Sequence, residues 1–143
     1  LKYIFSDWHP EIQEILESTK PGSLFKWGLH DRAPMNKWSK GRFSLLGDAA
    51  HPMLPFIAQG AAMAIEDGIV LASSLSSFDS VALGLNDYEN KRKYRTAKAQ
   101  KTATRNATIF HLSDFFAIFR NLVMKFFIKK IMDSFYKYDA ISK

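Results

Sequence analysis

Apolar residues recur at helical spacing along much of the chain. A short helix is predicted over residues 10–18, where apolar side chains share one face and acidic residues lie near the start. A second helix is predicted from Gln59-Gly60 to Leu75. It is rich in small residues and apolar on several sides, with Glu66 and Asp67 as its only charges. This pattern is typical of a helix packed closely inside a protein.

Two further helices are predicted in the second half of the chain. A strongly basic helix runs from Tyr88 to about Arg105, with Asn86 or Asp87 as its N-cap. Because it has few large apolar residues, we expect it at the surface. The next helix is capped by Ser113-Asp114 and carries a row of phenylalanines between residues 115 and 127, which we expect to be core or subunit interface.

Two segments have the character of strands. Residues 24–29 are predicted to form one, bounded by a Pro-Gly turn and by Asp31. Residues 42–46 are predicted to form another, and its unbroken Leu45-Leu46 end indicates burial on both faces, as in a parallel sheet. Residues 48–56 hold two prolines and should form a rigid loop. The order of elements is that of an α/β protein rich in helices.

Composition and charge narrow the possible functions. The 143 residues include no Cys, which excludes disulfides, Cys-ligated metals and a thiol nucleophile, and fits a reducing, cytoplasmic compartment. No apolar run is long enough to span a membrane. Residues 1–90 carry 7 Lys/Arg and 11 Asp/Glu, a net of −4, whereas residues 91–143 carry 13 and 3, a net of +10. The basic end suits an anionic membrane, an anionic cofactor or the solvated face of helices, whereas nucleic acid is not expected because stacking aromatics are missing.

The candidate chemistry lies where the second predicted strand ends. That strand delivers the carboxylate of Asp48 at its C-terminal edge, which is where open α/β sheets bind ligands. After the loop, Gly60 and small neighbours open the packed helix, whose unpaired N–H groups and dipole favour negative charge. A hydroxyl acceptor beside such a helix end suits a flavin or nucleotide cofactor.

Asp48 and His51 are three residues apart, but their spacing alone does not predict a metal site. The chain has no Cys, and His30 and His111 are distant in sequence, so no metal is expected. We expect His51 to be a loop histidine hydrogen-bonded to backbone, with a place near a flavin as the other option.

A set of short motifs runs in order through nearly the whole chain. They are Lys26-Trp27, Asp31-Arg32-Ala33-Pro34, Gly41-Arg42, Gly47-Asp48-Ala49-Ala50-His51-Pro52, Gln59-Gly60-Ala61, Glu66-Asp67, Asp87-Tyr88-Glu89, Arg92, Arg95, Phe110-His111-Leu112, Arg120-Asn121 and Tyr138-Asp139-Ala140. In these motifs the chain resembles the single-component FAD-dependent aromatic monooxygenases, especially the salicylate-hydroxylase-like branch. The resemblance implies an enzyme that hydroxylates a phenolic or aromatic acid with O₂ and NADH or NADPH, with a homodimer as a possibility.

The resemblance also implies roles for particular residues. Asp48 would bind a hydroxyl of the ribityl chain of the flavin, and Pro55 would lie against the isoalloxazine near the substrate. The backbone of Ala58, Gln59, Gly60, Ala61 and Ala62 would contact the pyrimidine edge. Many relatives have Gly at the position of Ala58.

The resemblance further implies a C-terminal piece of a glutathione-reductase-like fold. Residues 1–40 would be the end of a substrate-domain sheet, and residues 41–143 the last part of the FAD-binding domain with its C-terminal helices. The Gly-x-Gly-x-x-Gly fingerprint of the family does not occur in these 143 residues. We therefore expect the chain alone neither to hold FAD tightly nor to turn over substrate.

Two alternatives remain open at the level of sequence. Residues 91–130 resemble a non-catalytic basic helical module for an anionic membrane surface, with Phe126-Phe127 beside Lys125, Lys129 and Lys130. The other alternative is a flavin-dependent oxidoreductase of the same fold that does not hydroxylate rings.

Overall fold

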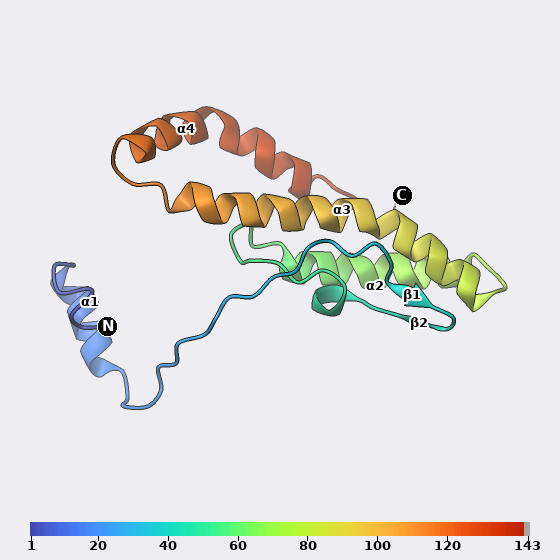
Figure 1. Ribbon diagram of the computed structural model, residues 1–143, viewed down its shortest axis with the longest axis horizontal. Helices are drawn as coiled ribbons and strands as arrows, with labels where there is room; N and C mark the ends of the chain where they lie inside the picture. The colour runs from blue at the N-terminus through green and yellow to red at the C-terminus, as the bar shows by residue number, and fades with distance from the viewer. Residues whose placement is uncertain (142–143) are drawn as a thin grey trace.

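In a computed structural model, which describes residues 1–141, the chain is mostly helical. Helix α2 (Gly60–Ser76) lies along α3 (Val81–Phe110), and α4 (Asp114–Tyr136) folds back beside the end of α3 (Figure 1). The small elements β1 (Ser39–Lys40), β2 (Phe43–Ser44) and the 3-10 helix η1 (Gly47–Ala49) lie against the α2–α3 pair. Residues 1–141 form a helix-rich unit with little sheet, so the sheet of the predicted α/β fold is only a small part of this structure.

Helix α1 (Pro10–Ser18) stands apart from the rest of the molecule at the end of an extended segment (Figure 1). It has the predicted bounds, with Pro10 in its first turn, and none of its residues is buried. The strand predicted at residues 24–29 is wrong: this segment is extended and exposed but pairs with no described strand. A β-strand needs a partner for its backbone groups, and without one the apolar pattern leaves only an extended chain.

The only sheet within residues 1–141 is a two-stranded antiparallel hairpin. Strand β1 pairs with β2 across a turn in which Gly41 has a φ of +62°. The second predicted strand, residues 42–46, is therefore shorter than expected, and it is not a member of a parallel sheet in this structure. Leu46 is exposed rather than buried on both faces.

Helices α2 and α3 pack closely near the turn that joins them because α3 carries a glycine there. A Cβ on Gly84 would lie 3.1 Å from the Leu75 Cα and 3.1 Å from the carbonyl oxygen of Ser74. Helix α2 has the predicted position, but α3 begins before Asn86 and Asp87, which were predicted to cap it. Asp87 instead accepts a hydrogen bond from the Ser74 hydroxyl at 2.7 Å and so helps to join the two helices.

The basic helix α3 is not a surface helix along its whole length, which corrects the sequence expectation. Its lysines at 91, 98 and 101 are exposed, but the opposite face is deeply buried and contains charged side chains. The buried residues recur at helical spacing and are Gly84, Leu85, Tyr88, Glu89, Arg92, Thr96, Ala99, Gln100 and Ala103. The expectation failed because buried Arg and Glu residues look like solvent-facing ones until their partners are known.

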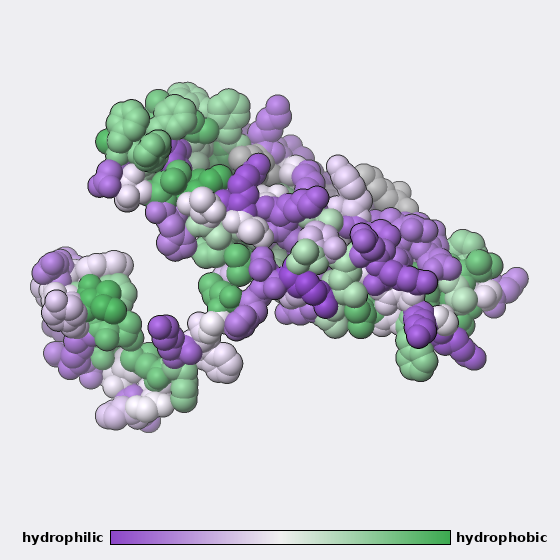
Figure 2. Space-filling model, viewed as in Figure 1, coloured by the Kyte–Doolittle hydropathy of each residue, from purple (hydrophilic) through white to green (hydrophobic). Residues whose placement is uncertain are grey.

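Helix α4 begins after Ser113, as predicted, and is anchored mainly at its far end. Phe135 is buried in a cluster with Ile57, Met63, Ala99 and Ala103. The phenylalanines in the first two thirds of α4 are not core within this chain: Phe115 is 74% exposed and Phe126 is 69% exposed. Figure 2 shows hydrophobic side chains gathered at the surface over α4. Among the described helices, none combines the length and the hydropathy needed to cross a bilayer.

Candidate cofactor site

Asp48 lies in η1, directly after the hairpin, with its side chain exposed to solvent. The preceding residue, Gly47, fixes the position of η1 against α2. Its N–H donates a hydrogen bond to Oδ2 of Asp67 at 3.0 Å, and its φ of +59° suits glycine. A Cβ on Gly47 would lie 3.3 Å from the Cβ of Ala64. Asp48 is thus held at an exposed rim beside the first half of α2.

The loop before α2 is held by hydrogen bonds from both sides. The Ala58 N–H donates to the carbonyl of Pro55 at 3.1 Å, and the Asn106 side chain on α3 donates to the carbonyl of Phe56 at 3.1 Å. Ala58 has a φ of +50°, in the left-handed region that favours glycine. This conformation explains why glycine suits the position, and alanine there costs about 1–2 kcal/mol.

The first turn of α2 presents backbone donors. Its first helical hydrogen bond runs from the Met63 N–H to the carbonyl of Gln59 at 2.9 Å, so the N–H groups of residues 60–62 have no acceptor within the helix. Apart from adjoining backbone, nothing lies within 4 Å of the place that a Cβ on Gly60 would take. Gln59 is buried, Gly60 and Ala62 are half-buried, and Ala61 is exposed.

The carboxylate and the helix opening lie on connected parts of the structure. Ala64, which η1 contacts, follows Gly60 by four residues, or about 6 Å along the helix. Asp48 directly follows Gly47, the residue of η1 that packs against Ala64. An exposed acceptor, unpaired N–H donors and an uncovered glycine within this region fit the chemistry of a flavin, which carries hydroxyls on its side chain and acceptor atoms along one ring edge.

A buried charge network lies directly beneath this region. Asp67 and Arg92 are both 0% exposed, and the Arg92 Nε donates to Asp67 Oδ1 at 2.7 Å. His51 is also fully buried, with its Nε2 2.6 Å from Asp67 Oδ2. Burial alone would raise the pKa of Asp67, but hydrogen bonds from His51, Arg92 and the Gly47 N–H outweigh it and lower that pKa.

Through the carboxylate of Glu66, the network extends to the end of α4 and to Tyr138 just after it. Glu66 lies 2.8 Å from Nη1 of Arg92, and it accepts two hydrogen bonds from Arg95, at 2.7 and 2.6 Å. The Arg95 guanidinium also donates to the carbonyl of Phe135 and stacks 3.8 Å from the ring centroid of Tyr138. One bidentate ion pair therefore joins α2, α3 and the segment around the end of α4.

Another buried carboxylate, that of Glu89 on α3, holds the hairpin. Glu89 Oε2 accepts hydrogen bonds from the N–H groups of Trp38 at 3.0 Å and Ser39 at 2.9 Å. Burial opposes ionisation, but these N–H groups and nearby Lys93 lower the pKa of Glu89. The Tyr88 hydroxyl donates to the carbonyl of Leu45 at 3.2 Å, and burial raises the pKa of that hydroxyl. Both interactions fix the strand that leads to Asp48.

These contacts change the picture given by the sequence in two ways. The sequence analysis expected the His51 side chain to hydrogen-bond to backbone, but its described partner is the carboxylate of Asp67. Sequence reasoning also missed the positioning role of Glu89 and the burial of Arg92. For Arg92 a signal was present: two carboxylates in an otherwise apolar helix, Glu66 and Asp67, indicate that buried cations face them.

Comparisons with known proteins agree with the resemblance. The profile of the FAD binding domain family matches residues 3–103. The 6-hydroxynicotinate 3-monooxygenase of Pseudomonas fluorescens is 44% identical over 110 residues, which cover 74% of this chain and 28% of that protein. The 3-hydroxybenzoate 6-hydroxylase of Klebsiella oxytoca is 35% identical over 134 residues, covering 93% of this chain and 32% of that protein. The chain therefore spans about a third or less of the length of these relatives.

A solved structure shares the arrangement of the helices. HpxO of Klebsiella pneumoniae, determined in complex with FAD and uric acid, superimposes with a TM-score of 0.80 at 27% identity. The superposition covers 95% of this chain and 36% of that one. Taken with the profile match over residues 3–103, this shows that the chain belongs to the FAD binding domain family.

Proposed function

We propose that this chain is part of an FAD-dependent monooxygenase that hydroxylates a phenolic or aromatic acid, with NADH or NADPH as reductant and O₂ as co-substrate. The observation that supports the proposal most is the seating of η1 on α2, which keeps the exposed Asp48 beside the helix opening at Gly60. The reported relatives, a monooxygenase and a hydroxylase of aromatic compounds, support the same reaction class.

In the proposed site, the residues of this chain bind and orient the flavin. Asp48 accepts a hydrogen bond from a ribityl hydroxyl, and the N–H groups of residues 60–62 donate to the pyrimidine edge of the ring. The dipole of α2 stabilises negative charge at that edge. The bound flavin supplies the transfer of electrons from the nicotinamide and the activation of oxygen.

The loop and the buried network position these groups. Pro55, next to the ring in this proposal, is held by the hydrogen bonds that close the loop at Ala58 and Phe56. Asp67 is a positioning residue, because it holds η1 through Gly47 and is itself fixed by Arg92. His51 belongs to this buried support and acts on the flavin only through Asp67 and η1.

The proposal includes the larger protein in which such a site is complete. Residues 41–143 would complete a FAD-binding domain of the glutathione-reductase-like class, and residues 1–40 would join a substrate-domain sheet that supplies the partner strands missing from residues 24–29. The exposed phenylalanines of α4 are compatible with a homodimer. The Cys-free sequence fits a cytoplasmic enzyme.

The non-catalytic basic module is not retained as an explanation of the chain. The family profile spans residues 3–103 and so accounts for residues 41–68, which a membrane module leaves unexplained. Much of the basic helix is also committed to internal contacts, including those of Arg92 and Arg95.

The experiment is a FAD titration of the complete protein that carries this chain. Purified protein should contain FAD and should oxidise NADH or NADPH faster when a hydroxybenzoate is added. Asp48→Ala should weaken FAD binding about tenfold or more, because a hydrogen bond to a charged group is lost. The matched control is Asp79→Ala, which removes another exposed aspartate.

Two results would contradict the proposal. One is equal FAD affinity in Asp48→Ala and Asp79→Ala. The other is a complete protein that binds no flavin. For the isolated chain of 143 residues we expect no stoichiometric complex at micromolar FAD.

A further inference from the structure

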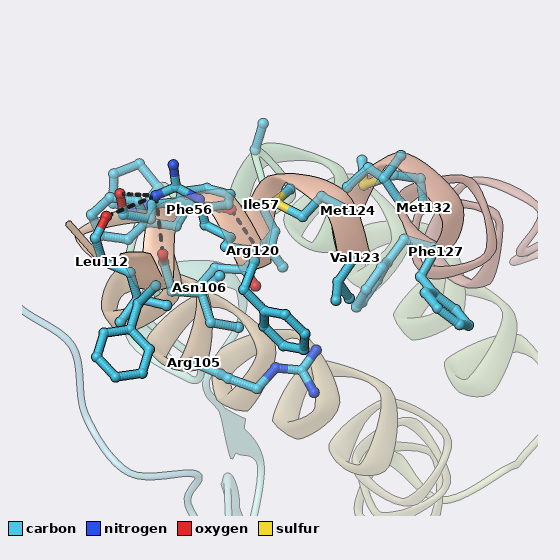
Figure 3. A pocket seen from close by; sticks show the side chains of 18 of the residues that line it. Phe56, Ile57, Arg105, Asn106, Leu112, Arg120, Val123, Met124, Phe127 and Met132 are labelled. Carbon is cyan, nitrogen blue, oxygen red and sulfur yellow. Dashed lines mark hydrogen bonds between the residues drawn. The ribbon is translucent and has the colours of Figure 1, made fainter. Parts of the chain in front are cut away.

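An apolar groove runs between the end of α3 and α4, and the loop before α2 forms part of its wall (Figure 3). Its volume is about 760 Å³, which lies within the range of small-molecule sites. Pro55 and Ala58 line it, as do side chains from the inner face of α4, including Val123 and Phe127. The groove therefore adjoins the loop that is proposed to meet the flavin.

Two of the polar side chains that line the groove, Asn106 and Arg120, hydrogen-bond to backbone carbonyls of the chain, whereas Arg105 and Tyr136 also line it. Asn106 donates to the carbonyl of Phe56. Arg120 donates to three carbonyls at the end of α3, those of Ile109, Phe110 and Leu112, at 3.3, 2.9 and 3.3 Å (Figure 3). Arg105 borders the groove and has no acidic partner among the described residues.

This distribution of groups defines the chemistry of a ligand. Because most of the side chains that line the groove are apolar, it should bind a ligand chiefly through apolar contact. The unpaired guanidinium of Arg105 complements one negative charge on the ligand. A small unsubstituted hydroxybenzoate would leave most of the 760 Å³ unfilled.

We propose that this groove is the specificity subsite for an apolar substituent of the substrate, and that the substrate is an aromatic acid with an alkyl or aryl side chain. Arg105 attracts the carboxylate of the acid, and the side chain lies between α3 and α4. This assignment of the groove to the substrate rests on the proposed function, whereas its affinity for such ligands does not.

The test is a calorimetric titration of the complete protein with benzoate and with 4-propyl-, 4-butyl-, 4-pentyl- and 4-hexylbenzoate. Affinity should rise about fourfold with each added methylene until the groove is full, as expected from the free energy of burying a methylene. Arg105→Gln should weaken every member of the series by a similar factor of about three. An affinity that does not change with chain length would overturn the proposal, because it would mean that other parts of the protein fill the groove.

Two neighbouring residues on α4 provide a matched pair of variants. Val123 lines the groove, whereas Leu122 lies outside it and is 56% exposed. Val123→Trp should fill the groove and abolish the dependence on chain length, and Leu122→Trp should leave it intact. Equal behaviour of the two variants would also overturn the proposal. Circular dichroism and thermal unfolding confirm that each variant is folded before it is titrated.

The outcomes separate this inference from the proposed function. If the protein holds FAD and hydroxylates benzoates but its affinity does not depend on chain length, the proposed function stands and the assignment of the groove is wrong. If the protein binds no FAD but its affinity still rises fourfold with each methylene, and Val123→Trp abolishes this rise, the groove is a site for apolar acids and the monooxygenase assignment is wrong.

Discussion

The two halves of α3 pack in different ways. The first half buries charge: Arg92 is 0% exposed, and it binds the equally buried Asp67 and the nearby Glu66. The second half faces the groove, where α4 covers it loosely and Phe127 remains 55% exposed. The ion pairs fix the position of α2 relative to α3, because charged hydrogen bonds have a narrow geometry. Apolar contacts in the second half are less directional and tolerate different packing partners. The rigidly positioned part of α3 thus lies beneath the candidate cofactor site, and the loosely packed part lies next to that site.

The largest effect is expected from breaking the buried ion pair. Asp67→Asn should lower the free energy of unfolding by about 3 kcal/mol, because it removes the fully buried one of the two carboxylates that neutralise Arg92 and leaves only Glu66. Denaturant unfolding followed by circular dichroism measures this loss. Asp87→Asn is the control, since Asp87 is partly exposed beside Lys91 and should cost less than about 1 kcal/mol. Similar losses in both variants would show that the network is not the stabilising feature.

The same carboxylate predicts how stability depends on pH. The pKa of Asp67 is lower in the folded chain than its ordinary value of 3.8, so its contribution to stability is complete above that value. It should be lost as the pH falls below 3.8 towards the lower folded pKa, because protonation then favours the unfolded chain. Unfolding at several pH values between 6 and 2 should show the gap between wild type and Asp67→Asn narrowing over this acidic range. A constant gap would contradict the assignment.

A smaller effect is expected where η1 meets α2. Gly47→Ala forces an alanine into a φ of +59° and pushes its Cβ to 3.3 Å from that of Ala64. The conformation alone costs about 1–2 kcal/mol. Gly41→Ala is the matched control, with a φ of +62° and no atom within 4 Å of the added Cβ. If thermal unfolding shows the Gly41 variant to be as destabilised as the Gly47 variant, the contact with α2 contributes nothing.

The sequence predicted the parts of this molecule that depend on local pattern. Helices α1 and α2 have the predicted positions, because helical spacing and small residues specify them locally. The strand at residues 24–29 was wrong because pairing depends on a partner that the described chain does not contain. The sequence singled out Asp48 and Gly60, but the contacts that hold them, from Asp67 to Gly47 and from Glu89 to the hairpin, join residues 20 to 51 positions apart. Such pairings cannot be deduced from spacing along one chain.

The smallest effect is expected on the outer face of α4. Phe126 is 69% exposed and lies outside the groove, so Phe126→Ala should change the free energy of unfolding of this chain by no more than about 0.5 kcal/mol. Phe135→Ala, nine residues further along the same helix, is the contrasting control, because Phe135 is 4% exposed within the apolar cluster and should cost about 3–5 kcal/mol. Denaturant unfolding of both variants measures the difference. A large loss in Phe126→Ala that increases with protein concentration would mean that this face is covered by a second copy of the chain.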